Sequence, residues 1–314
     1  MFTYKDLVER PDMLKYLSGL SVEQFNIVFN VVKPFCHLIQ YPDCKGTGTR
    51  AVDKETELLV FLATCRHALH HGVMAFMIHL SESTINRIFV GWAVFLDAIF
   101  KKLSLKPENG FLINQMPDIF IKTGHGLTDI VIDCTEFKFQ HATNLELNSI
   151  MFSNYKNTVT GKALIGISPH GSGLLFSDVY PGSISDSNIT EKSGVIEFVS
   201  PDHEVMADKG FAIQDLCAIK GAYLNRPTQK SGDQFSQADV AGNFDIAACR
   251  IHVERFIGRV RDWNILNAVW PVQRMDLVSS VWKGICHIVN LTMPPIGPKL
   301  VEVKDNNVVD FNIG

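Results

Sequence analysis

The chain has 314 residues, of which 46% are hydrophobic and 20% charged, and its net charge is −4. It is long enough for two domains, and it lacks the strong overall positive charge of many nucleic-acid-binding proteins. No uncharged apolar run reaches the roughly 18–20 residues of a membrane span. The seven cysteines are scattered with no CxxC pair, which excludes a disulfide framework or a zinc finger of the usual spacing.

The first part of the chain is predicted to be helical. Ser21 and Gln24 have the spacing of a capping box, so we expect a helix to begin there and to end or bend at Pro34. A loop over Lys45–Thr49 separates it from a second helix that begins near Asp53.

The next segment has the layout of a helix-turn-helix. We expect a short helix over Val73–Leu80, a turn at Ser81–Glu82 and a long helix over Ser83–Lys102. In such motifs the start of the second helix enters the major groove, which makes Asn86 and Arg87 the candidate DNA contacts. The alternative is an ordinary helical hairpin in which a serine only caps the second helix.

The composition changes after this segment. We predict a helical domain over residues 1–106, a linker over 107–128, a catalytic domain over 129–298 and a polar tail over 299–314.

Strands and helices alternate in the predicted catalytic domain. We expect strands over Ile130–Phe139, Lys162–Ile167, Leu174–Val179, Val205–Asp208 and Ala222–Leu224, and helices over Ser185–Val199, Ile213–Ile219 and Ser236–Trp263. A polar loop over Thr228–Gln234 precedes the last helix. This alternation is typical of an α/β fold with a sheet between helices.

Three acidic residues stand out in that domain. Asp133 ends the apolar run Ile130–Ile132, Asp208 ends the run Val205–Ala207, and Glu254 lies in the last predicted helix. Carboxylates at such positions suit Mg²⁺, and three of them could hold two ions about 3.5–4 Å apart. A single aspartate at a strand end is more often a turn or cap residue, so the hypothesis depends on the fold bringing all three together.

Basic residues surround Glu254 on the same helix. The candidate phosphate contacts are Arg250, Arg255, Arg259 and Arg261. The apolar stripe that should face the sheet is Cys249, Val253, Phe256, Val260 and Trp263. The alternative is a simple i,i+4 ion pair between Arg250 and Glu254 on a solvated face, which contributes only a few tenths of a kcal/mol.

Other polar residues have weaker signals. Lys156, beside Tyr155, could contact a DNA backbone phosphate. Asp186 is expected to cap a helix, with a place in the site as the second interpretation. Glu136 should lie on the opposite strand face from Asp133 and is not expected to bind metal.

Several segments together resemble the DDE superfamily endonucleases, the transposase family related to PIF/Harbinger elements and to those fused to THAP domains. The segments are Val131–Glu136, Ser153–Lys156, Ile165–Gly171, Tyr180–Asp186, Ala207–Phe211 and Arg250–Arg255. They occur in the family's order within residues 129–292, and the region just upstream resembles the family's helix-turn-helix.

The resemblance implies an RNase H-like mixed sheet flanked by helices, preceded by an all-α helix-turn-helix domain. It places Asp133 on the first strand, Asp208 on the fourth and Glu254 on a later helix. It implies two Mg²⁺ (or Mn²⁺) ions, attack of water on a phosphodiester at a transposon end, and attack of the freed 3′-hydroxyl on target DNA.

The resemblance also implies partners and a location. DNA is the expected substrate, in the nucleus, with a homo-oligomer or an accessory DNA-binding protein as further partners and no membrane. Family relatives often carry a zinc-dependent or Myb-like module, whose ligand set we do not see here. The alternatives are a domesticated DNA-binding or assembly protein that keeps the fold without its chemistry, and a hydrolase of small phosphoesters.

Overall fold

The computed structural model describes residues 2–43, 52–103, 105, 116–228 and 237–294. The predicted loop Lys45–Thr49, the first part of the predicted linker, most of the polar loop before the last predicted helix and the whole polar tail lie outside the described residues.

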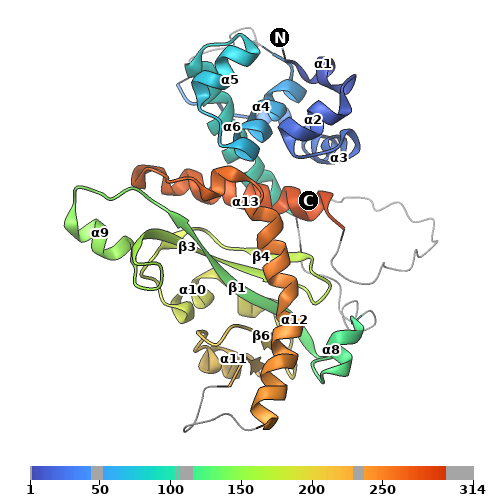
Figure 1. Ribbon diagram of the computed structural model, residues 1–314, viewed down its shortest axis with the longest axis vertical. Helices are drawn as coiled ribbons and strands as arrows, with labels where there is room; N and C mark the ends of the chain where they lie inside the picture. Colours follow the sequence, from blue (N-terminus) through green and yellow to red (C-terminus); the bar gives the residue numbers. More distant parts are fainter. Residues whose placement is uncertain (1, 44–51, 104, 106–115, 229–236, 295–314) are drawn as a thin grey trace, which may run out of the picture.

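The N-terminal part is helical, as predicted (Figure 1). Its helices are α1 (Tyr4–Val8), α2 (Pro11–Ser18), α3 (Val22–Val32), the 3₁₀ helix η1 (Lys33–Leu38), α4 (Lys54–His67), α5 (His71–Ile78) and α6 (Glu82–Phe100). The capping box at α3 is confirmed, because the Ser21 hydroxyl accepts the Gln24 N–H at 3.2 Å and the Gln24 side chain accepts the Ser21 N–H at 2.9 Å. Pro34 falls in η1, where the α-helical pattern has ended.

The short helix, turn and long helix predicted before residue 102 are present as α5 and α6. Ser81 caps α6 by accepting the Thr84 N–H at 3.2 Å. By length and composition α6 could cross a membrane, but 56% of that stretch is buried inside the protein, where it packs against α4, α5 and α13. It therefore has the surroundings of a core helix. Recognition of DNA by its N-terminus stays a prediction.

One mixed sheet forms the centre of the C-terminal part (Figure 1). Its strands are β1 (Thr128–Lys138), β2 (Phe152–Ser153), β3 (Thr158–Ile167), β4 (Gly173–Phe176), β5 (Tyr180–Pro181), β6 (Glu204–Met206) and β7 (Tyr223–Asn225). The order is β2-β3-β1-β6-β7, with β4 and β5 also paired to β3. β1 runs antiparallel to β3 and parallel to β6.

Helices cover both faces of this sheet. They are α8 (Asp118–Lys122), α9 (Leu145–Met151), α10 (Asp186–Ser193), η2 (Val195–Phe198), α11 (Gln214–Lys220), α12 (Gln237–Arg261), η3 (Asn264–Asn267), η4 (Val272–Arg274) and α13 (Met275–Thr292). Alternate residues of β1 belong to different cores: Val131 and Phe137 pack with α12 and α13, whereas Ile130 and Ile132 pack with α10 and α11. This architecture is compatible with the predicted RNase H-like fold.

Three features of this region differ from the sequence predictions. The helix expected over Ser185–Val199 is interrupted at Gly194, whose φ of +69° ends α10 before η2 begins. The strand expected to reach Asp208 ends at Met206. The long helix α13 was not predicted.

The helical part and the sheet share one apolar core through α13. Trp282 of α13 is fully buried, packs edge-on to Phe137 of β1 at 5.3 Å between ring centroids, and donates its indole N–H to the Ser177 carbonyl at 3.2 Å. From the helical part, the Gln24 side chain donates to the Thr292 carbonyl at 2.8 Å. Phe120, in the predicted linker, is also buried. The division into domains at residues 106 and 128 stays a prediction.

Candidate active site

Asp133 lies in the middle of a strand rather than at its end. β1 continues to Lys138, and Asp133 is opposite Ile165 of β3. Its Oδ1 accepts the N–H of Cys134 at 2.7 Å, which fixes the carboxylate against the strand. The predicted apolar run before it is confirmed, because Ile130, Val131 and Ile132 are all buried, and the strand continues past Asp133 as predicted.

Asp208 is brought to the same level by the parallel pairing of β1 and β6. Val131 is the partner of Met206, so two residues further along each chain lie Asp133 and Asp208. Asp208 follows the end of β6, where its Oδ1 accepts the N–H of Lys209 at 2.7 Å, and its side chain is 52% exposed. The sheet therefore fixes one carboxylate and presents the other on the adjoining loop.

Glu254 comes from α12, which crosses the sheet beside these residues. The predicted apolar stripe of this helix is confirmed, since Cys249, Val253, Phe256, Val260 and Trp263 are all buried. Glu254 lies beside that stripe and is exposed. The helix thus packs its apolar side on the sheet and leaves Glu254 at the border with solvent.

The electrostatics of Asp133 connect the three acids. The pKa of Asp133 is raised to about 6: burial is the main cause and the charges of Asp208 and Glu254 add to it, whereas the Cys134 N–H and the Arg250 guanidinium act in the opposite direction. The negative charges of Asp208 and Glu254 are therefore close enough to be felt at Asp133. That the three acids form one metal site stays a prediction.

Arg250 lies among these acids. Its Nη1 donates to Asp208 Oδ1 at 3.0 Å, and only 11% of its side chain is exposed. The sequence left open an ion pair between Arg250 and Glu254, one turn apart. In the structure Arg250 instead pairs with Asp208, 42 residues earlier in the chain.

The acid group suits a hard divalent cation in its chemistry. All three donors are carboxylates, and their mutual repulsion at Asp133 is what a bound cation would relieve. With the side chains placed as they are, no three acidic, histidine or cysteine residues within the described parts of the chain could hold one metal ion.

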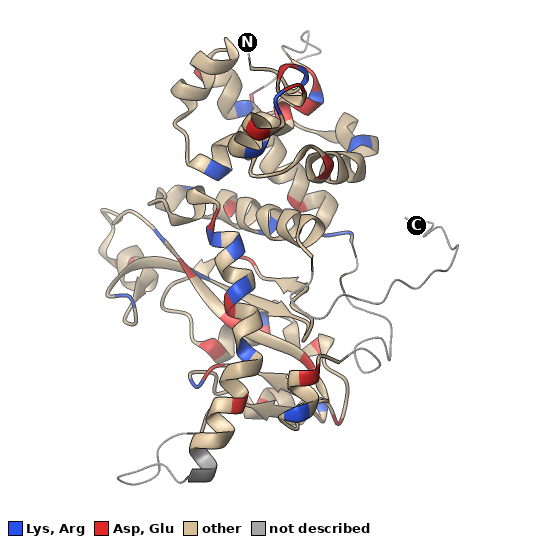
Figure 2. Ribbon diagram, turned by 45° about the vertical axis from the view of Figure 1, so that its right-hand side comes forward, with Lys and Arg blue, Asp and Glu red and all other residues tan. Residues whose placement is uncertain are grey.

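The other arginines of α12 have different surroundings. Figure 2 shows basic residues spaced along this helix. Arg255 is exposed, and Arg259 donates to the Pro294 carbonyl at 3.0 Å. Arg261 points into the protein, donating to the Thr135 hydroxyl at 2.6 Å and to the carbonyls of Glu136 and Leu266, both at 2.5 Å. We therefore leave Arg261 out of any DNA surface.

The remaining predicted DNA contacts lie away from the acid group. Lys156 is exposed in the turn before β3, with its ammonium over the Tyr155 ring at 4.7 Å, near the opposite end of β3 from the partner of Asp133. Asn86 and Arg87 are half-buried in the first two turns of α6, within the N-terminal helices. The fold does not bring these three residues to the acids.

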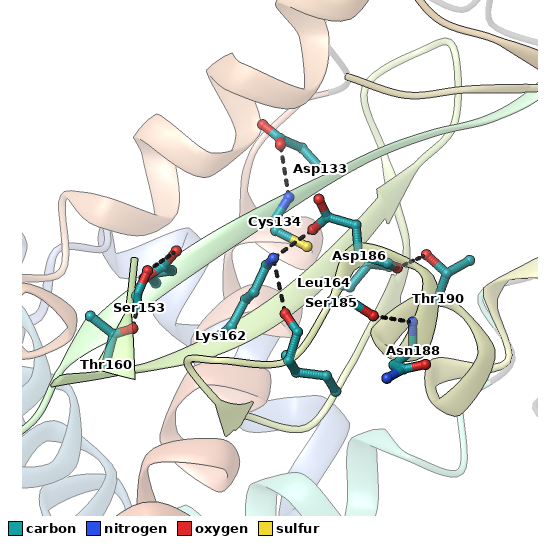
Figure 3. A network of polar contacts seen from close by, with 12 residues as sticks. Asp133, Cys134, Ser153, Thr160, Lys162, Leu164, Ser185, Asp186, Asn188 and Thr190 are labelled. Atoms are coloured by element: carbon teal, nitrogen blue, oxygen red, sulfur yellow. Dashed lines mark hydrogen bonds and ion pairs between the residues drawn. The ribbon is translucent and has the colours of Figure 1, made fainter. Parts of the chain in front are cut away.

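A half-buried ion pair on the other face of β1 was not predicted. Lys162 of β3 donates to Asp186 Oδ1 at 2.5 Å (Figure 3). The predicted cap role of Asp186 is wrong, because Ser185 caps α10 by accepting the Asn188 N–H at 3.2 Å and leaves the Asp186 carboxylate for Lys162. The other oxygen, Oδ2, faces Gly210, where an added Cβ would lie 3.1 Å away.

The Asp186 carboxylate therefore lies next to Gly210, in the loop after Asp208. One signal for the Lys162–Asp186 pair was present in the sequence, a serine directly before Asp186 that is an equally good cap. Glu136, on this same face, accepts from the hydroxyls of Ser153 and Thr160 at 3.1 and 2.6 Å, as expected for a residue turned away from Asp133.

Comparison with known proteins adds one finding. A family model described as DDE superfamily endonuclease matches residues 132–290, just over half of the chain. The match begins one residue before Asp133, includes Asp208 and Glu254, and ends within α13. No curated protein matches the chain.

Proposed function

This chain belongs to the DDE superfamily endonucleases, and on that premise we propose that it is a transposase-type DNA endonuclease and strand transferase. In this proposal Asp133, Asp208 and Glu254 hold two Mg²⁺ or Mn²⁺ ions. The observation that supports the proposal is the parallel register of β1 and β6, which places Asp133 and Asp208 at the same level. The charge of Glu254 on α12 also acts on Asp133.

Each acid has a distinct part. Asp133 is held rigidly by its strand and by the Cys134 N–H, so it fixes the position of the site. Asp208, on the loop, and Glu254, on the exposed side of α12, can adjust to the cations and to the DNA strand. Bound divalent ions would activate the attacking water or 3′-hydroxyl and stabilise the leaving oxygen.

The surface of α12 next to Glu254 is suited to a DNA backbone. Arg255 is exposed one residue after Glu254, and a Cβ added at Gly258 would meet nothing within 4 Å. A phosphate could therefore approach this helix closely and pair with the guanidinium. We propose Arg255 as a phosphate contact, with Arg259 at the end of the same surface.

The proposal is tested by incubating the purified chain with supercoiled plasmid DNA. We expect nicking with Mg²⁺ or Mn²⁺ and none when a chelator removes the metal, because carboxylates alone cannot stabilise the leaving oxygen. Nicking that continues unchanged in chelator would rule out the metal-dependent mechanism. DNA binding with no cleavage under any metal would instead indicate the domesticated alternative.

A second part of the proposal assigns DNA binding to the helix-turn-helix. We propose that the N-terminus of α6 contacts DNA through Asn86 and Arg87, both partly exposed there. Replacing Arg87 by alanine should weaken duplex binding about 3- to 10-fold at low salt and lower the slope of log affinity against log salt by about 1. Fluorescence anisotropy in chelator measures this without cleavage.

The matched control removes one positive charge from the other end of the same helix. Lys101 is exposed at the C-terminus of α6, so Lys101→Ala should leave affinity nearly unchanged. If both variants weaken binding equally, the effect comes from overall charge, and the N-terminus of α6 is not the contact.

A further inference from the structure

Arg250 is the arginine of α12 that lies against the proposed metal-binding acids. Its guanidinium is mostly buried and donates to Asp208 Oδ1 at 3.0 Å. Its Nε is buried with no hydrogen-bond partner among the described residues. A buried arginine that uses only part of its donor capacity is held by charge rather than by a full set of hydrogen bonds.

The charge that holds Arg250 is that of the acid group. Arg250 pairs directly with Asp208. The guanidinium therefore neutralises a carboxylate that a divalent cation would need. A divalent cation and the guanidinium compete for Asp208 Oδ1, because binding of the cation to this oxygen would weaken its hydrogen bond to Arg250.

We propose that Arg250 is a positioning residue that acts as an internal cation: it holds Asp208 while the acid group is without metal and must release it when metal binds. The inference rests on the proposed function, in which the acids bind divalent metal. If Arg250 has this role, its removal strengthens metal binding, whereas loss of a merely structural arginine would weaken it.

The test measures Mn²⁺ binding directly, without DNA and without turnover. Mn²⁺ alone is titrated into the full chain, and free Mn²⁺ is followed by its electron paramagnetic resonance signal. We expect Arg250→Met to bind Mn²⁺ about tenfold more tightly than the unsubstituted chain, because the competing positive charge is gone. Arg250→Lys should return most of the original affinity, since it restores a cation at the same position.

Lys209→Met is the matched control. Lys209 directly follows Asp208 and is exposed, so the substitution removes the same charge close by without removing a buried contact. It should tighten Mn²⁺ binding by no more than about threefold, because solvent screens an exposed charge. Equal affinity for Arg250→Met and the unsubstituted chain, or weaker binding by the variant, would overturn the inference.

Failure of the inference and failure of the proposed function give different results. If the unsubstituted chain binds Mn²⁺ and Asp133→Asn abolishes that binding, the proposed metal site stands. The titrations of the Arg250 variants then decide the inference. If Asp133→Asn leaves Mn²⁺ binding unchanged, the proposed site itself is wrong. Circular dichroism melting checks the fold of each variant, and Arg250→Gln replaces Arg250→Met if the latter does not fold.

Discussion

Asp133→Asn should lower metal-dependent DNA cleavage by at least about 10³-fold, the largest effect on activity that we expect of any single substitution. The side chain keeps its shape and can still accept the Cys134 N–H, but it loses the negative charge that a divalent cation requires. Groups that act as one catalytic unit show losses of this size when one member is removed. Plasmid nicking with Mg²⁺ and with Mn²⁺ measures it.

The control for this experiment is on the same strand. Glu136→Gln makes the same chemical change three residues away, on the face that bears Ser153 and Thr160 rather than the acid group. It should retain activity within a fewfold. Cleavage by Asp133→Asn at the rate of the Glu136→Gln protein would remove Asp133 from the active site, provided that both proteins melt normally.

Trp282→Ala should destabilise the whole protein by about 3–5 kcal/mol, the largest effect on stability that we expect. The indole is fully buried, packs on Phe137 at 5.3 Å, and donates to the Ser177 carbonyl, which would lose this partner. Because α13 lies between the N-terminal helices and the sheet, both parts should lose stability together. Urea unfolding followed by circular dichroism measures the change.

The control for Trp282→Ala is the same kind of substitution at a large aromatic residue on the surface. Phe76 is 82% exposed, so Phe76→Ala should change the free energy of unfolding by no more than about 0.5 kcal/mol. Two separate unfolding transitions, of which Trp282→Ala shifts only one, would show that the helical part and the sheet do not unfold as one unit.

The acid group and Arg250 have a common physical basis. Burial and mutual repulsion disfavour three negative charges at one place, as the raised pKa of Asp133 shows. A positive charge is therefore needed there, and Arg250 supplies it in the structure described. The proposed function and the further inference differ only in which cation occupies that position and when.

Features determined within a few residues were predictable. The Ser21–Gln24 capping box needs only residues three apart, and the apolar stripe of α12 follows from a helical repeat that the sequence displays directly. Asp133 and Asp208 could be singled out because each ends an apolar run. The acids also occur in family order, which is information that the sequence holds without any coordinates.

Contacts between distant residues were not predictable. The Arg250–Asp208 pair joins residues 42 apart, the Lys162–Asp186 pair joins residues 24 apart, and Arg261 reaches Thr135 across 126 residues. From the helix alone, Arg250 and Arg261 were both candidates for DNA contacts. A helical wheel shows on which side of the helix a residue lies, but not which residues of other elements pack against that side. Asp186 was expected to cap a helix because its partner Lys162 lies 24 residues earlier in the chain, too far for local sequence patterns to reveal.

The sequence by itself determined many of the helices and strands, though not α13, and which carboxylates are candidates, because local backbone preferences and apolar periodicity act over a few residues. Only the tertiary structure decided which charges meet. The parallel register of β1 with β6 and the packing of α12 on the sheet bring Asp208 and Arg250 together, and charge interactions depend on distance through space rather than along the chain.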